Sequence, residues 1–144
     1  MIETYRGVVT PSEIDLMGHM NVKFYSEKFD QATWRFFNTI GITIQYIEKE
    51  KKGCVAVEIV SGYRKELFAG SPVSIKTGLL DIAGKKIRLL HTMYEDQSGD
   101  IAATCELLGV HFDLARRKSL EFPPHILEKA LGYKIQAPPG AQGS

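Results

Sequence analysis

The 144-residue sequence predicts an α+β protein in which one curved antiparallel sheet wraps around a long central helix. Apolar residues recur every three or four positions over about 19 residues after Asn21, which is typical of an amphipathic helix. After Gly53 the apolar period changes to two in successive stretches, which is typical of strands. A helix with a broad apolar face needs only one sheet to bury it, so residues 1–136 are expected to form a single domain. Residues 137–144 contain Pro, Gly and Gln and are expected to be a disordered tail.

The first strand is expected over residues 4–9 and the central helix directly after Asn21. Asn21 is a suitable N-cap, because its side-chain oxygen can accept a hydrogen bond from a first-turn N–H group. Gly41 is placed to end the helix as a residue with left-handed backbone. The apolar stripe of the helix, widened by Trp34 and Phe37, consists of Tyr25, Phe29, Ala32, Phe36 and Ile40.

Four long strands are expected after the helix. Apolar residues alternate along residues 55–60, 73–79, 87–93 and 101–112. The last two breaks between these stretches are short and typical of hairpins, so the four strands are interpreted as an antiparallel meander. The pair Pro123-Pro124 then opens a short helix that reaches to about Leu131.

Composition and charge exclude several classes of protein. The formal net charge is +1 and the basic residues are spread along the chain, which argues against a nucleic-acid or membrane-surface binder. Residues 49–52 are the nearest thing to a basic block, but Glu50 interrupts them, and a solvated loop is expected there. No signal peptide and no stretch of roughly 20 apolar residues is found, so a cytoplasmic location is expected. Cys54 and Cys105 lie in apolar segments and are expected to be reduced core residues.

The stretch Asp15-Leu-Met-Gly-His-Met-Asn21 combines groups that are suited to attack on a carbonyl. A carboxylate can act as a base or a nucleophile, and the first N–H groups of a helix can hold the oxyanion that forms. A carboxylate near a helix N-terminus is kept ionised by the positive end of the helix dipole, which suits a base or nucleophile better than an acid. From the residues alone, a turn role for Asp15 stays open, since Asp is common in loops.

Three stretches resemble the hotdog-fold acyl-CoA thioesterases, and most closely the group around 4-hydroxybenzoyl-CoA thioesterase. Residues 15–25 are similar to the pattern Asp-x-x-Gly-His-x-Asn-x-x-x-Tyr of that family. Residues 63–70, with Tyr-Arg-Lys-Glu-Leu and a later Gly, resemble its second strand and the following turn. Residues 110–124, with Val-His-Phe-Asp-Leu, Arg-Arg and Pro-Pro, resemble its last strand and the exit from it.

The resemblance implies a thioester hydrolase that cleaves an acyl-CoA to the free acid and CoA without a cofactor. It implies that Asp15 is the catalytic nucleophile or general base and that the backbone N–H of Val22 is the oxyanion donor. It also implies a homodimer, in which the two sheets join edge to edge and acyl-CoA binds at the subunit interface. A dimer of dimers, and thus a homotetramer, is an equal expectation.

The other residues of the first stretch each allow a structural and a functional interpretation. His19 flanks the site in the family pattern, and direct participation in catalysis stays open beside a structural role. Asn21 is favoured as a helix cap over a catalytic group. Gly18 is expected to adopt a backbone conformation that a side chain would forbid, with its N–H as a candidate pocket group. Tyr25 is expected in the core, with its hydroxyl at the edge of the substrate pocket.

Four basic residues are candidates for binding the phosphates of CoA. Arg64 and Lys65 lie on the second strand of the expected sheet, near the turn that follows it. Arg116 and Arg117 follow the last strand. For each of them a solvated or salt-bridged side chain is an equal alternative.

Other chemistries find less support in the sequence. Some hotdog thioesterases use a carboxylate on the helix, but Glu27 and Asp30 fall off the apolar stripe and are expected to be solvated. No Gly-x-Ser-x-Gly motif is found, which argues against a serine hydrolase. A metal site is not expected, because no ligand spacing typical of metals occurs among His19, His91, His111 and Asp15. The main alternative function is a non-catalytic hotdog module that binds acyl-CoA, and a hydratase is less favoured.

Overall fold

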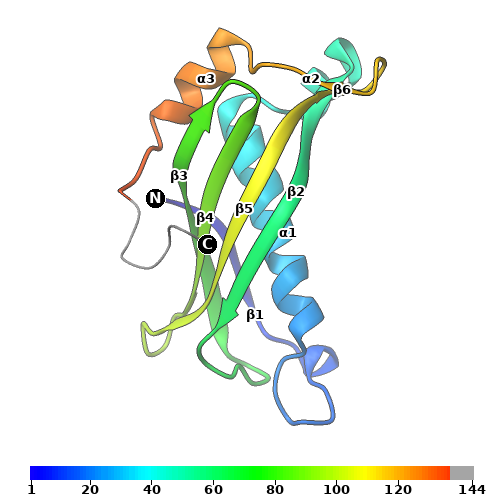
Figure 1. Cartoon of the computed structure of the whole chain (residues 1–144). Coiled ribbons are helices and arrows are strands. Elements are labelled where there is room, and N and C mark those ends of the chain that lie inside the picture. Colours follow the sequence, from blue (N-terminus) through cyan, green and yellow to red (C-terminus); the bar gives the residue numbers. More distant parts are fainter. Residues whose placement is uncertain (137–144) are drawn as a thin grey trace.

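One antiparallel sheet curves around the long helix α1 in the computed structural model, which describes residues 1–136 (Figure 1). The predicted disordered tail, residues 137–144, lies outside the described residues. The elements follow one another as β1 (Ile2–Val8), the 3-10 turn η1 (Pro11–Glu13), α1 (Val22–Ile40), α2 (Ile44–Glu50), β2 (Lys52–Tyr63), β3 (Pro72–Ala83), β4 (Lys86–Glu95), β5 (Ile101–Asp113), β6 (Lys118–Ser119) and α3 (Pro124–Leu131).

Helix α1 begins and ends where the sequence predicts. The side-chain oxygen of Asn21 accepts a hydrogen bond from the N–H of Lys23 at 3.0 Å, which caps the helix. Gly41 ends it with a φ of 104°, in the left-handed region that glycine adopts without strain. The predicted stripe is buried along its whole length, but Trp34 is 43% exposed and lies beside the free edge of the sheet.

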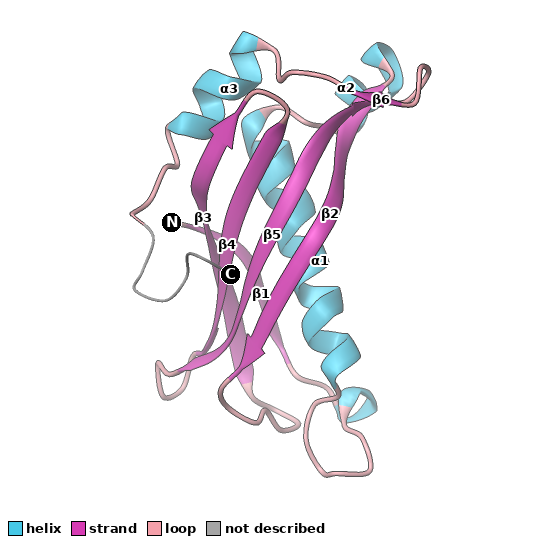
Figure 2. Cartoon of the chain, in the orientation of Figure 1, coloured by secondary structure: helices cyan, strands magenta, loops and turns pink. Residues whose placement is uncertain are grey.

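The strand order corrects the prediction of a four-strand meander. The sheet runs β1-β3-β4-β5-β2, so only β3, β4 and β5 form a meander (Figure 2). Strand β2 lies at the far edge and pairs with β5 from Lys52 opposite Asp113 to Tyr63 opposite Ala103. The physical reason is the link between β2 and β3, residues 64–71, which is not a tight hairpin and can cross from one side of the sheet to the other. Among residues 1–136, β2 pairs with β5 alone, so its other edge is free.

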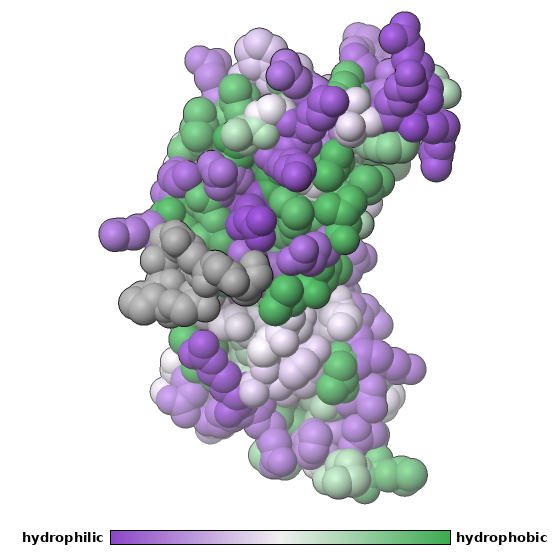
Figure 3. Space-filling model, in the orientation of Figure 1, coloured by the Kyte–Doolittle hydropathy of each residue, from purple (hydrophilic) through white to green (hydrophobic). Residues whose placement is uncertain are grey.

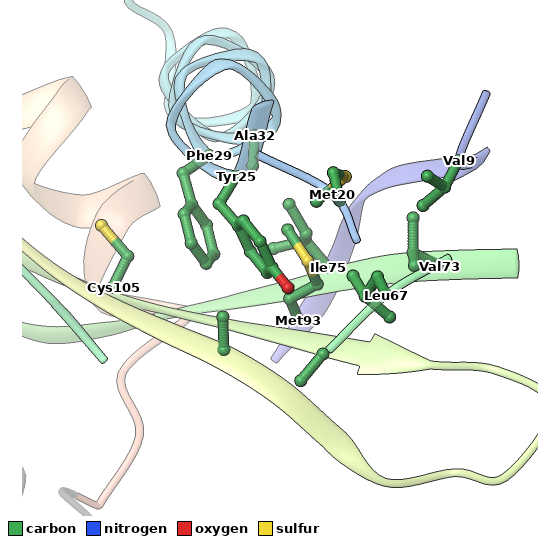
Figure 4. Packing of buried hydrophobic residues seen from close by; sticks show 12 residues of the cluster. Val9, Met20, Tyr25, Phe29, Ala32, Leu67, Val73, Ile75, Met93 and Cys105 are labelled. Atoms are coloured by element: carbon green, nitrogen blue, oxygen red, sulfur yellow. The ribbon is translucent and has the colours of Figure 1, made fainter. Parts of the chain in front are cut away.

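The core fills the space between α1 and the concave face of the sheet. Near the start of the helix, Tyr25 and Phe29 point from α1 towards Ile75 and Met93 on the strands (Figure 4). Burying side chains of this size is the main favourable term in folding, at about 1.5–3 kcal/mol each. A second cluster around Phe36 continues the core towards α3.

A buried polar chain crosses this apolar interface. His91 on β4 is fully buried, with its Nε2 2.8 Å from the hydroxyl of Thr33 on α1. Its Nδ1 lies 2.7 Å from the hydroxyl of Thr77 on β3. Burial lowers the pKa of His91 from 6.5 to about 4, so the ring is neutral at pH 7. Both ring nitrogens are thus satisfied by hydroxyl groups.

The region after the helix was predicted less well. Residues 49–52 are not a solvated loop, because α2 extends through Glu50 and β2 begins at Lys52. Thr43 provides the signal that explains the extra helix, since its hydroxyl accepts a hydrogen bond from the N–H of Tyr46 at 3.1 Å.

Cys54 and Cys105 are free and buried, as predicted. Among residues 1–136, no helix combines the length and the apolar character that crossing a membrane requires.

Candidate active site

The loop between η1 and α1, residues 14–21, folds back on itself as a tight turn. The N–H of Asp15 donates to the carbonyl of His19 at 3.1 Å, and the N–H of Gly18 donates to the carbonyl of Asp15 at 3.0 Å. Gly18 has a φ of 89°, as expected for a residue that must lack a side chain. Its N–H already donates a hydrogen bond inside the turn and is not available to a ligand. Gly18 therefore serves to allow the backbone conformation of the turn.

Two groups outside this loop hold it in place. The carboxylate of Glu13 in η1 and the ammonium of Lys28 on α1 form an ion pair at 2.5 Å, with side chains only 11% and 4% exposed. The other carboxylate oxygen of Glu13 accepts from the N–H of Thr10 at 2.8 Å. Burial alone would raise the pKa of Glu13, but the bonds from Lys28 and Thr10 outweigh it and lower that pKa. The carbonyl of Glu13 accepts from the N–H of Asn21 at 3.0 Å, so this pair anchors the start of α1.

Asp15 is held by two hydrogen bonds to its carboxylate. One oxygen accepts from the side-chain amide of Asn21 at 3.0 Å, and the other from the N–H of Met17 at 2.8 Å. These bonds, the Asn21 bond first, lower the pKa of Asp15, and the nearby His19 adds to the effect. Asp15 is therefore ionised at neutral pH. Asn21 does more than cap the helix, because one amide group joins the helix start to this carboxylate.

A pocket of about 240 Å³ opens beside the first turn of α1. Its lining residues are His19, Met20, Val22, Tyr25, Tyr63, Arg64, Lys65 and Glu66. Within residues 1–136, the N–H of Val22 has no hydrogen-bond partner, whereas the N–H groups of Lys23 and Phe24 both donate to Asn21. The pocket thus contains a residue with an unused backbone donor at a helix N-terminus, where an oxyanion is stabilised.

The structure brings some of the predicted site residues into this pocket and leaves others outside it. Val22, His19, Tyr25, Arg64 and Lys65 line it. The three remaining residues of the predicted site lie in the adjoining loop and not in the lining of the pocket; they are Asp15, Gly18 and Asn21.

The second wall of the pocket comes from the end of β2 and is tied to the helix by Tyr25. The hydroxyl of Tyr25 donates to the carbonyl of Lys65 at 3.0 Å, and its ring meets Tyr63 edge-on at 5.1 Å. Burial, together with Tyr63 and Glu66, raises the pKa of Tyr25, so the phenol stays neutral. The sequence singled out Tyr25 but missed Tyr63 and Glu66 as pocket residues, because they lie about 40 positions further along the chain, at the end of β2 and in the link after it.

His19 lies at the rim of the pocket between two acceptors. Its Nδ1 is 3.3 Å from its neighbour's carbonyl, that of Met20, and its Nε2 is 3.8 Å from the carboxylate of Glu66. The geometry suits a histidine that braces the loop, and a ring at this place can also contact a bound ligand.

The candidate phosphate-binding residues fall into two separate places. Lys65 is already paired with Asp100 at 2.9 Å, whereas the guanidinium of Arg64 forms no ion pair within residues 1–136. Arg116 and Arg117 lie in the turn between β5 and β6, at the end of the sheet where β2 begins. Figure 1 shows this end far from the loop that precedes α1.

A separate, mostly apolar groove of about 140 Å³ lies between α1 and β2. Trp34, Phe37 and Ile59 contribute much of its apolar lining, and Asp30 lies at its exposed rim. Glu27 is exposed and lies outside the groove. Among residues 1–136, no three His, Cys, Asp or Glu side chains come close enough to hold a metal ion.

Comparison with known proteins places this geometry in a family. The profile of the thioesterase-like superfamily matches residues 9–130. Betainyl-CoA thioesterase of Pseudomonas aeruginosa is 27% identical over 99% of this chain and 91% of the relative. The L-carnitine dehydrogenase/betainyl-CoA thioesterase of Ruegeria pomeroyi is 33% identical over 88% of this chain, which spans only 25% of that longer protein.

Solved structures agree with the fold. Protein SAV2348 of Staphylococcus aureus, in complex with CoA, superimposes with a TM-score of 0.89 at 22% identity, covering 100% of this chain and 95% of the other. The probable thioesterase YbaW of Escherichia coli gives a TM-score of 0.78 at 20% identity, covering 94% and 100%. The predicted hotdog fold and the predicted enzyme class, a thioester hydrolase, are confirmed. The chain belongs to the thioesterase-like superfamily.

Proposed function

We propose that residues 1–136 form one domain that hydrolyses an acyl-CoA thioester to the free acid and CoA, in the pocket at the start of α1. The observation that carries the proposal is the N–H of Val22, which has no partner within residues 1–136 and belongs to a pocket residue. Close to it, the same amide that caps α1 holds the ionised Asp15. A donor for an oxyanion and a carboxylate ready to attack or to take a proton are what thioester hydrolysis requires.

In the proposed mechanism the thioester carbonyl accepts a hydrogen bond from the N–H of Val22. Asp15 then removes a proton from a water molecule, whose oxygen adds to the carbonyl carbon to give a tetrahedral oxyanion. Collapse of this intermediate breaks the C–S bond, and the CoA thiolate leaves and takes up a proton. This route suits Asp15, since a water can lie between the carboxylate and the carbonyl.

Direct attack is the second route open to the same residues. The carboxylate of Asp15 would add to the carbonyl carbon, expel the CoA thiolate and form an anhydride, which water then hydrolyses. Single-turnover reactions in ¹⁸O-labelled water detect the direct route when the label is found in Asp15. Label enters Asp15 itself only when the carboxylate forms the anhydride and water attacks its carboxyl carbon.

The free edge of β2 supports a homodimer as part of the proposal. Along this edge strand Val57 is 57% exposed and Ile59 is 58% exposed. Figure 3 shows hydrophobic residues gathered over the upper part of β5 and β2. An exposed apolar edge strand is a template for pairing with a second strand, and a twofold axis would pair β2 with its own copy. We expect Val57→Lys to convert the dimer to a monomer, as measured by light scattering.

The acyl group is suggested by the relatives and by the aromatic wall of the pocket. Two relatives carry betainyl-CoA thioesterase in their names, and betaine contains a quaternary ammonium group. The edge-on rings of Tyr25 and Tyr63, with the carboxylate of Glu66 beside them, are of the kind that attracts such a cation. Betainyl-CoA is therefore the first substrate to test.

A thiol-release screen over betainyl, short, long and aromatic acyl-CoAs tests the proposed function. We expect release from at least one of them, with Asp15→Asn reducing kcat by roughly a hundredfold or more. Glu27→Gln is the matched control, because it removes an exposed carboxylate from the same region and should leave the rate unchanged. If Asp30→Asn abolished release and Asp15→Asn did not, the helix would carry the catalytic carboxylate. Tight binding without release from any acyl-CoA would favour a non-catalytic binding module.

A further inference from the structure

The groove between α1 and β2 is lined by side chains that the proposed chemistry does not use. Its opposite wall comes from the sheet, with the exposed Ile59 on β2 and Leu107 on β5. Its volume of about 140 Å³ is comparable to that of a cavity of about 150 Å³ that holds one benzene molecule, so it suits a small group. The wall on α1 is a strip of residues spaced by four, four and three positions, namely Ser26, Asp30, Trp34 and Phe37.

Two aromatic rings form a corner in this groove. The ring centroids of Trp34 and Phe37 are 5.9 Å apart, and the ring planes meet at 87°. Trp34 is 43% exposed whereas Phe37 is buried, so the indole stands on the solvent side of the corner. The face of an aromatic ring attracts a cation through its quadrupole, and the indole ring does so most strongly.

The rim of the groove carries a carboxylate without a counter-ion. Asp30 lies one turn before Trp34, so the two side chains are neighbours on the surface of the helix. Its carboxylate is exposed and has no ion-pair or hydrogen-bond partner within residues 1–136. Among the described residues that line the groove, Asp30 alone is charged. A free negative charge beside an aromatic corner favours a cation over a neutral apolar ligand.

The groove is too far from the catalytic pocket to hold the same cation as the substrate. Val22 and Trp34 are separated by about 18 Å along α1, at about 1.5 Å per residue. In a betainyl group the nitrogen lies two bonds from the carbonyl carbon, which is about 2.5 Å. A substrate whose carbonyl lies at Val22 therefore keeps its ammonium group beside Tyr25 and Tyr63.

We propose that the groove is a second ligand site, which binds a small quaternary ammonium compound outside the catalytic pocket. The methyl groups of such an ion contact the rings of Trp34 and Phe37, and its charge faces Asp30. A quaternary ammonium ion fits better than a primary one, because it has no N–H group that an apolar groove would leave without a partner. Betaine, the acid that hydrolysis of betainyl-CoA would release, belongs to this class, but the inference does not depend on that hydrolysis.

Fluorescence measures occupation of the groove directly, because Trp34 is the only tryptophan in the chain. At constant ionic strength, we expect choline to give a saturable change in emission at concentrations on the order of 1 mM. Its uncharged carbon analogue dimethylbutanol has the same shape and should bind at least about tenfold more weakly. Equal Kd values for the two compounds would overturn the proposal. An emission that choline leaves unchanged would do the same, and would mean that the groove is closed to ligands, for example by a second subunit.

Carboxylate variants test the place of the charge. For Asp30→Asn we expect the Kd of choline to rise roughly fivefold, because the ring contacts remain while the opposite charge is lost. Glu27→Gln is the matched control, since it removes an exposed carboxylate of the same helix from outside the groove and should leave the Kd unchanged. An unchanged Kd in Asp30→Asn, or an equal loss in the control, would refute the site.

A variant in the catalytic pocket separates the two hollows. Glu66→Gln removes the carboxylate of the pocket and should leave the response of Trp34 to choline unchanged. If it weakened that response as much as Asp30→Asn, the cation would lie in the pocket and the proposal would be wrong. Since no thioester is used, a protein that releases no thiol from any acyl-CoA can still show the site, and an active enzyme can lack it.

Discussion

Replacing Lys28 by Met should both destabilise the protein and loosen the loop of residues 14–21, which holds Asp15. The variant removes the ammonium but keeps the length of the side chain, so Glu13 keeps its place without its counter-ion. Removing one partner of a buried ion pair costs about 3–5 kcal/mol, because the other charge is left uncompensated. Since Glu13 keeps its bond to the N–H of Thr10, the lower end of that range applies. For a chain of this size, about 3 kcal/mol lowers Tm by about 10 °C.

Differential scanning calorimetry and urea unfolding measure the effect. The double variant Glu13→Gln/Lys28→Met should recover most of the loss, because no charge is then left buried. Arg35→Met is the control, a cation removed from an exposed position of the same helix, with an effect within about 0.5 kcal/mol. Equal losses in Lys28→Met and in the double variant would refute the reasoning.

The same pair links pH and activity. The pKa of Glu13 is lowered in the folded state, so its contribution to stability is present above the usual value of 4.5 and is lost as the pH falls through the folded value. The double variant should lack this part of the acid sensitivity. Because the carbonyl of Glu13 accepts from Asn21 N–H, kcat/KM of Lys28→Met should fall further than its folded fraction explains.

Three further predictions concern the loop and the core. Asn21→Ser keeps a capping oxygen but removes the amide that lowers the pKa of Asp15, so the acid limb of the kcat/KM profile should move to higher pH while Tm changes little; an unmoved limb would contradict this role. Gly18→Ala should destabilise by about 1 kcal/mol in urea unfolding, because its φ of 89° strains any side chain; a neutral result would mean that the loop relaxes. His91 should make the free energy of unfolding fall by about 3 kcal/mol as the pH drops from 6.5 to about 4, since only the unfolded ring takes up a proton in that range. His91→Gln should flatten this pH dependence, and an identical slope in the variant would rule His91 out as the cause.

Much of the scaffold followed from local patterns in the sequence. The cap at Asn21, the end at Gly41 and the buried stripe between them depend on neighbouring residues, which is why they could be predicted. The place of β2 could not, because strand pairing is a long-range property and residues 64–71 do not signal on which side they cross. Helix α2 was missed because its charged residues match a loop as well as a short helix.

In the candidate site too, some residues could be predicted from the sequence and others could not. Asp15 and Val22 could be singled out because the family pattern lies within one short stretch. The amide bridge from Asn21 to Asp15 depends on a loop conformation that spacing alone does not determine. The anchoring pair Glu13 and Lys28 was missed, because lysine on a helix is usually solvated and only the folded loop buries it.

The hydrogen bonds that link Thr33, His91 and Thr77 affect how precisely α1 is oriented about its own axis. Apolar packing tolerates small rotations of a helix about its axis, since dispersion contacts have little directional preference. The bond between Thr33 and His91 has a narrow geometry and therefore fixes the rotational setting of α1 against the sheet. That setting decides the direction of the backbone dipole at Val22, three turns away. A redesigned core with well-packed hydrophobic residues in place of Thr33, His91 and Thr77 should gain thermal stability. It should also leave the N–H of Val22 without a fixed orientation.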